Sequence, residues 1–132
     1  ENSLKRLKTD YVDLYYIHFP DPNVPPSESV GELTRLKKEG KLGVGISNVN
    51  LEQLKQANEH HDISALQAQY NMFQRSVEQD LLPYCAENDI SFIPYGPLAY
   101  GLLGGGWTKD YQPETAWRKK QDLFQLEYLK TI

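Results

Sequence analysis

Four short apolar runs, each followed by a helix-like segment, constrain the fold of this chain more than any other feature. The runs are Tyr11–Phe19, Leu42–Ile46, Ala65–Tyr70 and Ser91–Tyr95. They begin 31, 23 and 26 residues apart, which is typical of successive strand–helix units because a parallel strand pair needs a long crossover connection. They are also almost continuously apolar, as strands are when helices cover a parallel sheet. The sequence therefore predicts an α/β fold with four parallel strands.

The segments between the runs carry signals for the beginnings of helices. In a capping box, two side chains three residues apart satisfy backbone N–H groups at a helix start. Three pairs have this spacing: Ser29 with Glu32, Asn50 with Gln53, and Ser76 with Gln79. Apolar residues follow each pair at helical spacing, so we expect a helix after each one. The first of these helices is expected to end at Gly40, since glycine commonly follows the last helical residue.

Both ends of the sequence carry incomplete helical patterns. Ser3–Leu7 has the pattern of the last turns of a helix, and a second pattern begins at Leu123 and shows no terminating signal before Ile132. We therefore expect residues 1–132 to form a single partial domain with both ends open. Residues 99–118 are rich in Gly, Tyr and Trp and are expected to form a long irregular stretch, a kind of segment that often binds ligands.

Composition excludes several classes of function. With 14 basic and 18 acidic residues the net charge is −4, so the sequence lacks the basic surface of a nucleic-acid-binding protein. Its longest apolar runs are far shorter than the roughly 20 residues of a membrane span, and no secretory signal precedes them. The single cysteine, Cys85, cannot form an internal disulfide or support a metal cluster. We expect no membrane partner, no metal and a reducing, cytoplasmic location.

Polar residues follow the predicted strands where a ligand would bind. In parallel α/β folds, ligands bind at the carboxyl ends of the strands. Those ends carry His18, then Ser47 and Asn48, then Gln67, and then Tyr95. Polar side chains cost free energy when they are desolvated without a partner, so a ligand can be that partner. The alternative is structural, with Ser47 and Asn48 capping the next helix and His18 bonding to the backbone. The residues alone leave both interpretations open.

The same strand ends resemble four motifs of the aldo-keto reductases. The matching segments are Asp10–Asp21 with Ile17-His18-Phe19-Pro20, Gly45–Asn48, Leu66–Asn71, and Pro94–Leu98 with Gly101–Leu103. They occur in the family's order for its fourth to seventh strands, and the resemblance covers essentially the whole chain. It implies a portion of a (β/α)8 TIM barrel, about strands 4 to 7 with their helices. It also implies that this portion belongs to an NADPH-dependent oxidoreductase that reduces aldehydes or ketones to alcohols.

The resemblance further implies roles for individual residues. His18 matches the catalytic histidine that hydrogen-bonds the carbonyl of a small substrate. Ser47, Asn48 and Gln67 match the residues that hold the nicotinamide carboxamide of NADP. Further cofactor contacts are implied for Tyr95, Pro97, Leu98, Gly101, Leu103 and Gly105.

Three departures from the family pattern limit what the segment is expected to do alone. Gly105-Gly106 replaces the usual Gly-Lys of the loop that closes on the pyrophosphate, and Lys41–Gly45 is one residue shorter than expected. The family's catalytic tyrosine, lysine and first aspartate precede the fourth strand, and nothing upstream of His18 matches them. The 2′-phosphate and adenine contacts follow the eighth strand. The isolated segment is therefore expected to be inactive.

Two alternatives belong to other classes of function. The same fold can serve as a cofactor-binding regulatory subunit without turnover, and the change at Gly105-Gly106 favours that possibility. A non-catalytic half-barrel is the other alternative. Because half a barrel exposes two sheet edges, such a chain is expected to self-associate through them.

Overall fold

The computed structural model describes residues 2–38, 43–106 and 114–125. These residues contain a four-stranded sheet whose strand order follows the sequence and whose neighbouring strands are all parallel. The strands are β1 (Leu14–Ile17), β2 (Gly43–Ser47), β3 (Ile63–Gln69) and β4 (Ser91–Tyr95). The predicted α/β fold with four parallel strands is therefore confirmed.

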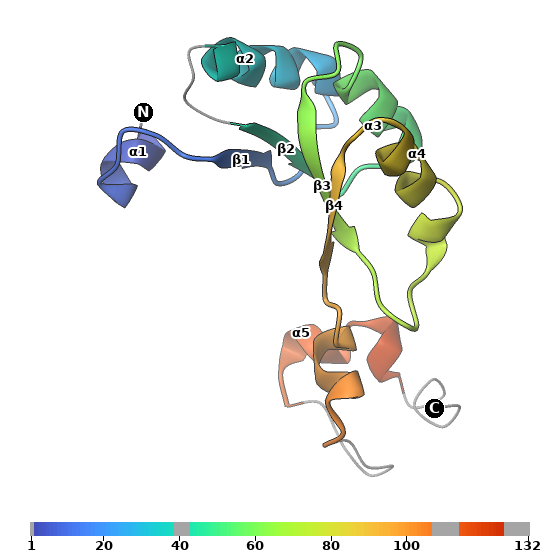
Figure 1. The fold of residues 1–132 in the computed structure, drawn as a ribbon. Coiled ribbons are helices and arrows are strands. Elements are labelled where there is room, and N and C mark those ends of the chain that lie inside the picture. Colours follow the sequence, from blue (N-terminus) through green and yellow to red (C-terminus); the bar gives the residue numbers. More distant parts are fainter. Residues whose placement is uncertain (1, 39–42, 107–113, 126–132) are drawn as a thin grey trace.

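Helices cover one face of this sheet (Figure 1). The helices that follow β1, β2 and β3 are α2 (Pro26–Lys38), α3 (Leu51–Ala57) and α4 (Leu81–Glu87), the last preceded by the 3-10 turn η1 (Ser76–Glu78). The predicted helix at the start of the chain is present as α1 (Asn2–Leu7). No helix in the described ranges is both long and apolar enough to cross a bilayer.

The segment after β4 lies beyond the carboxyl ends of β3 and β4 (Figure 1). It contains η2 (Ala99–Gly104), α5 (Ala116–Lys119) and η3 (Asp122–Phe124). Residues 99–118, predicted to form a long irregular stretch, contain η2 and most of α5 in their described part, and residues 107–113 lie outside that part. Leu123, where a helical pattern was predicted to begin, is in η3, and residues 126–132 lie outside the described part.

The main apolar core fills the space between the sheet and its helices. Alternate residues of β2 and β3 enter it, and Val44, Ile46 and Leu66 have no exposed surface. Leu54 of α3 and Cys85 of α4 meet them from the helical side. Because strand residues alternate between faces, the residues between these core positions lie on the opposite side of the sheet, which we call the inner face. Burial raises the pKa of the Cys85 thiol, so this cysteine is a core residue and not a nucleophile.

Only one of the three predicted capping boxes forms. The Asn50 side chain accepts from the backbone N–H of Gln53, and the Gln53 side chain accepts from the N–H of Asn50, so this box is confirmed. The box at Ser29 was wrong, because α2 begins three residues earlier at Pro26. Proline suits the first helical position, since its φ is already helical and its missing N–H has no partner there. Lys38 is the last helical residue, and the predicted stop at Gly40 lies outside the described residues.

The predicted box at Ser76 was also wrong. Ser76 begins only the short turn η1, and the α-helix itself starts at Leu81, where the Asp80 side chain accepts from the Leu81 N–H. Pro83 explains the difference. In a helix starting at Ser76 this proline would lie in the interior and break the hydrogen-bond ladder, whereas in α4 it lies in the first turn, where proline is tolerated.

The bounds of the first three strands differ from the prediction. The first strand is shorter than Tyr11–Phe19, the second extends to Ser47, and the third begins at Ile63 and ends at Gln69 instead of spanning Ala65–Tyr70. In the pairing of β2 with β3, Val44 lies opposite Ile63 but Gly45 lies opposite Ala65, so β3 has one extra residue at this point. Ile63 and Leu66 therefore both enter the core although they are three residues apart. β2 itself alternates without interruption, so Ser47 lies on the same side as Gly45, on the inner face.

Gly45 makes room for an aromatic ring on the inner face. A Cβ atom added at Gly45 would lie 2.6 Å from a ring carbon of Tyr16, which is its pairing partner on β1. The Tyr16 hydroxyl is buried and has no hydrogen-bond partner among the described residues. Burial therefore raises the pKa of Tyr16. The ring can occupy this position only because Gly45 carries no side chain.

We therefore expect Gly45→Ala to destabilise the fold by about 1 to 3 kcal/mol, the usual effect of overpacking. Urea unfolding of the intact polypeptide that contains this chain measures the change. Gly31→Ala is the matched control, because nothing lies within 4 Å of a Cβ added there on α2. The control is expected to be neutral or to stabilise by up to about 1 kcal/mol through helix propensity. Equal stabilities for the two variants would contradict the packing argument.

The outer edges of the sheet carry backbone groups that no described strand pairs with. These edges belong to β1 and β4, and Tyr15 and Ile93 on those strands are exposed. Unpaired strand edges are templates for pairing with another chain. We propose that residues 1–132, studied as an isolated chain, self-associate through these edges. Sedimentation velocity should show oligomers that grow with concentration, and Ile93→Lys should weaken them. A monomer at all concentrations would contradict the proposal.

Candidate functional site

Asn48 connects the carboxyl ends of all four strands. Its side-chain Nδ2 donates to the backbone carbonyl of His18 after β1, at 2.9 Å, and to Ser47 Oγ on β2, at 3.1 Å. Its Oδ1 accepts from the Tyr95 hydroxyl on β4 at 3.0 Å, and its backbone N–H donates to the carbonyl of Gln67 on β3 at 3.4 Å. The predicted site residues of the four strand ends are thus brought together around one amide.

The backbone at Asn48 adopts a conformation that favours its residue type. Its φ is +56°, in the left-handed region, which asparagine tolerates better than most residues other than glycine. This turn aims the side chain back across the strand ends. The orientation of the amide is also determined, because the His18 carbonyl can only accept and must therefore face the Nδ2 group. Tyr95 is consequently the donor to Oδ1.

These bonds determine which polar atoms remain available to a ligand. Both N–H bonds of the Asn48 side chain, on Nδ2, are used within the protein. The side chain can therefore offer a ligand only the acceptor Oδ1. Ser47 donates to the Gln67 carbonyl at 2.9 Å and is left with acceptor capacity only. The side-chain amide of Gln67 has no partner among the described residues and can both donate and accept. The set therefore complements a ligand amide.

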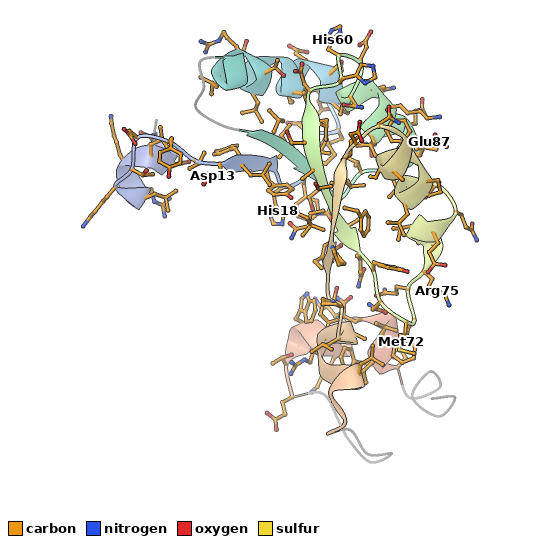
Figure 2. All side chains as sticks on the ribbon, viewed as in Figure 1. Asp13, His18, His60, Met72, Arg75 and Glu87 are labelled. Atoms are coloured by element: carbon orange, nitrogen blue, oxygen red, sulfur yellow. The ribbon has the colours of Figure 1, made fainter. Side chains whose placement is uncertain are left out.

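His18 lies beside this cluster at the end of β1. Its side chain is exposed, and its ring lies 4.6 Å from the ring of Phe19, centroid to centroid. Figure 2 shows His18 near the carboxyl ends of the strands and His60 at the opposite end of the sheet, so only the first is near the site. The backbone of His18 is held by Asn48, and its imidazole remains available to a ligand.

Tyr100 extends the site toward the segment that follows β4. Its hydroxyl accepts a hydrogen bond from Nε2 of Gln69 at 2.6 Å, and its ring lies edge-on to Trp117 at 4.7 Å. Burial raises the pKa of the Tyr100 hydroxyl, and a charge on nearby Tyr95 would raise it further. Gln69 and Tyr100 were not among the predicted site residues. A signal for Gln69 was present in the sequence, because residues two apart on a strand lie on the same face and Gln69 is two residues after Gln67.

The predicted cofactor contacts lie at the end of β4, along η2 and directly after it. Gly96, Gly101 and Gly105 have φ values of +63°, +105° and +76°, so glycine is the favoured residue at each. Pro97 and Leu98 are exposed, and Gly101 and Leu103 are half-buried. Gly104–Gly106 is exposed, and nothing lies within 4 Å of Cβ atoms added there. The loop therefore offers accessible backbone but no cation at the position where the family pattern has lysine.

A second polar cluster lies outside this site. The Tyr70 hydroxyl donates to Glu78 at 2.6 Å, and Arg75 makes two bonds to the same carboxylate. The Arg75 and Tyr70 hydrogen bonds lower the pKa of Glu78. Tyr70, Arg75 and Met72 also line a cavity of about 400 Å³ with Pro94 and Pro97. In the described part of the chain, no group of three or more His, Cys, Asp or Glu residues is placed to hold a metal ion.

Comparison with known proteins identifies the fold and its family. The model of the Aldo/keto reductase family matches residues 1–131. The glycerol dehydrogenase AKR11B4 from Gluconobacter oxydans has a structure that superposes with a TM-score of 0.89 at 34% identity, over 98% of this chain and 40% of that one. The chain belongs to the aldo/keto reductase family, and its sheet and helices are a portion of a TIM barrel.

Curated relatives include aldo-keto reductase YhdN of Bacillus subtilis, 43% identical over 84% of this chain and 34% of the relative. The NADH-specific methylglyoxal reductase of Escherichia coli is 38% identical over 98% of this chain and 41% of the relative. A Klebsiella pneumoniae aldo/keto reductase in complex with NADP and acetate matches with a TM-score of 0.68, at 33% identity over 83% of this chain and 40% of that one. The chain thus spans about two fifths or less of these proteins.

The contacts of Asn48 lead to a stability prediction. Asn48→Gly retains the left-handed backbone but removes the side-chain hydrogen bonds, so we expect a loss of about 1 to 2 kcal/mol. Asn48→Ala should lose about 1 kcal/mol more, because alanine is strained at this φ. Urea unfolding of the intact polypeptide measures both variants. A glycine variant as stable as the parent would show that these hydrogen bonds contribute nothing.

Proposed function

We propose that the intact polypeptide containing this chain is an oxidoreductase that reduces aldehydes or ketones to alcohols with NADPH. The observation that carries the proposal is the convergence of His18, Ser47, Asn48 and Gln67 at the carboxyl ends of the strands. Membership of the aldo/keto reductase family supports the same reaction class. Residues 1–132 alone are proposed to be inactive, since the proton donor of the reaction is expected on a preceding strand.

The polar atoms at the strand ends fit the carboxamide of a nicotinamide. A carboxamide carries a carbonyl that accepts and an NH2 group that donates. Gln67 is the donor to the carbonyl, and Asn48 Oδ1 is the acceptor for the NH2 group, because both N–H bonds of Asn48 Nδ2 are used within the protein. Ser47 is buried and contributes by holding Asn48 in place. When bound, the nicotinamide supplies the hydride. The three side chains fix the ring so that one face is presented.

His18 has the properties needed to orient the other reactant. A neutral imidazole donates one N–H, which can hydrogen-bond the carbonyl oxygen of a substrate and stabilise the negative charge that develops there. Its exposed position beside the nicotinamide-binding residues suits a small carbonyl compound. Methylglyoxal is one such compound, and the name of the E. coli relative makes it a natural first substrate to test.

The choice between NADPH and NADH depends on residues outside this chain. NADPH is proposed because a Klebsiella pneumoniae relative was crystallised with NADP, whereas the E. coli relative is named as NADH-specific. The family's 2′-phosphate contacts are expected after the eighth strand. Both cofactors therefore belong in the assay. A cytoplasmic location is proposed with this function, because the cytoplasm supplies both reduced nucleotides.

His18→Ala tests the proposal directly. With methylglyoxal as substrate, we expect kcat/KM for NADPH oxidation to fall about 100- to 1,000-fold, as when one donor to a developing oxyanion is removed. His60→Ala is the matched control, since His60 lies at the other end of the sheet and should leave activity unchanged. Equal losses in both variants, or none in either, would contradict the role given to His18.

Binding without turnover is the outcome that would favour a regulatory subunit. The exposed Gly104–Gly106 segment, with no cation, is the observation behind this second candidate. NADPH and NADH fluorescence titrations of the intact polypeptide measure binding independently of reduction. Tight binding of either nucleotide with no oxidation across a panel of aldehydes and ketones would replace the reductase proposal with this one.

A further inference from the structure

The hydroxyl of Tyr95 makes a hydrogen bond to Asn48, in addition to the cofactor contact predicted for this residue. Its hydroxyl donates to Asn48 Oδ1 at 3.0 Å, across 47 residues of sequence and from a strand two positions away in the sheet. The hydroxyl is half-buried, and the acceptor is the same amide whose Nδ2 holds the His18 carbonyl. One side chain of β4 is thus connected through one amide to the residue proposed to bind the substrate.

The Tyr95 hydroxyl determines where the Asn48 amide can be. The amide could otherwise rotate about its last torsion, which is broad and poorly restrained in asparagine. Donation from Tyr95 fixes Oδ1 on the β4 side, while the His18 carbonyl and Ser47 Oγ fix Nδ2 on the β1 side. With these bonds in place, one lone pair of Oδ1 accepts from Tyr95 and the other points in a defined direction, where it can accept from a ligand. That position is the one assigned above to the nicotinamide NH2 group.

We infer that the Tyr95 hydroxyl is a positioning residue for carbonyl reduction, acting through Asn48 on both the nicotinamide and His18. The inference rests on the proposed function. It assigns to Tyr95 an effect on the rate of the reaction and not only on cofactor affinity. A misplacement of reacting groups by a fraction of an ångström or more lowers the rate of a step that depends on their alignment.

Tyr95→Phe in the intact polypeptide isolates this effect, because it retains the ring and removes only the hydroxyl. With methylglyoxal and NADPH, we expect kcat to fall roughly 3- to 10-fold, the equivalent of one hydrogen bond, while the substrate KM changes less than twofold. Tyr84→Phe is the matched control. It also removes a tyrosine hydroxyl that makes a hydrogen bond, with the Asn58 side chain, but on the helical side of the sheet and away from the site. Its kcat should equal that of the parent.

A double-mutant cycle separates positioning from a general structural effect. If the hydroxyl acts through Asn48, then Tyr95→Phe should have no further effect on kcat when it is introduced into Asn48→Gly. A purely structural effect of Tyr95 would instead lower kcat by the same factor in both backgrounds. Urea unfolding of the four proteins shows whether any loss of rate follows loss of folded protein.

The outcomes distinguish this inference from the function on which it depends. A parent polypeptide that neither binds nor oxidises NADPH or NADH overturns the proposed function, and the inference with it. An active parent with an equally active Tyr95→Phe variant overturns the inference alone. Additive effects in the cycle also overturn it. A reduced kcat in Tyr95→Phe that disappears in the Asn48→Gly background, with Tyr84→Phe unchanged, supports it.

Discussion

The amide of Asn48 is the interaction on which the arrangement of the site depends. Parallel strands are held along their length by backbone ladders, but their carboxyl ends project into loops where the ladder stops. Here one side chain continues the connection, with bonds that reach His18, Ser47 and Tyr95. An amide is suited to this role because it carries two donors and an acceptor in fixed directions. The bonds within the protein use both donors of this amide, so only its acceptor oxygen remains available to a ligand.

Much of the fold was predictable from the sequence because its signals are local and repeated. The run Ser91–Tyr95 and the box at Asn50 were predicted correctly, since each depends on residues within one element. The starts of α2 and α4 were not. There the decisive residues were Pro26 and Pro83, whose fixed backbone outweighed the better side-chain signals nearby. Capping pairs alone do not show which of several candidate starts a proline permits.

That the candidate site residues lie close together was predictable, but their connections were not. The rule for strand ends placed His18, Ser47 and Gln67 at the carboxyl ends of neighbouring strands. The bond between Tyr95 and Asn48 joins the fourth strand to the second and depends on the register of two strand pairings. The bond between Gln69 and Tyr100 depends on left-handed residues at the start of η2. Neither contact leaves a trace in local sequence spacing.

The strand order has a consequence for how the site is built as the chain folds. Because the order follows the sequence, each strand can join the sheet as it leaves the ribosome, next to a strand already in place. The bonds of Asn48 to His18 and Ser47 need only β1 and β2, whereas its bond to Tyr95 must wait for β4. The sheet can therefore be largely assembled while Oδ1 of Asn48 still lacks its hydrogen bond, and the site acquires its final geometry only when β4 supplies Tyr95.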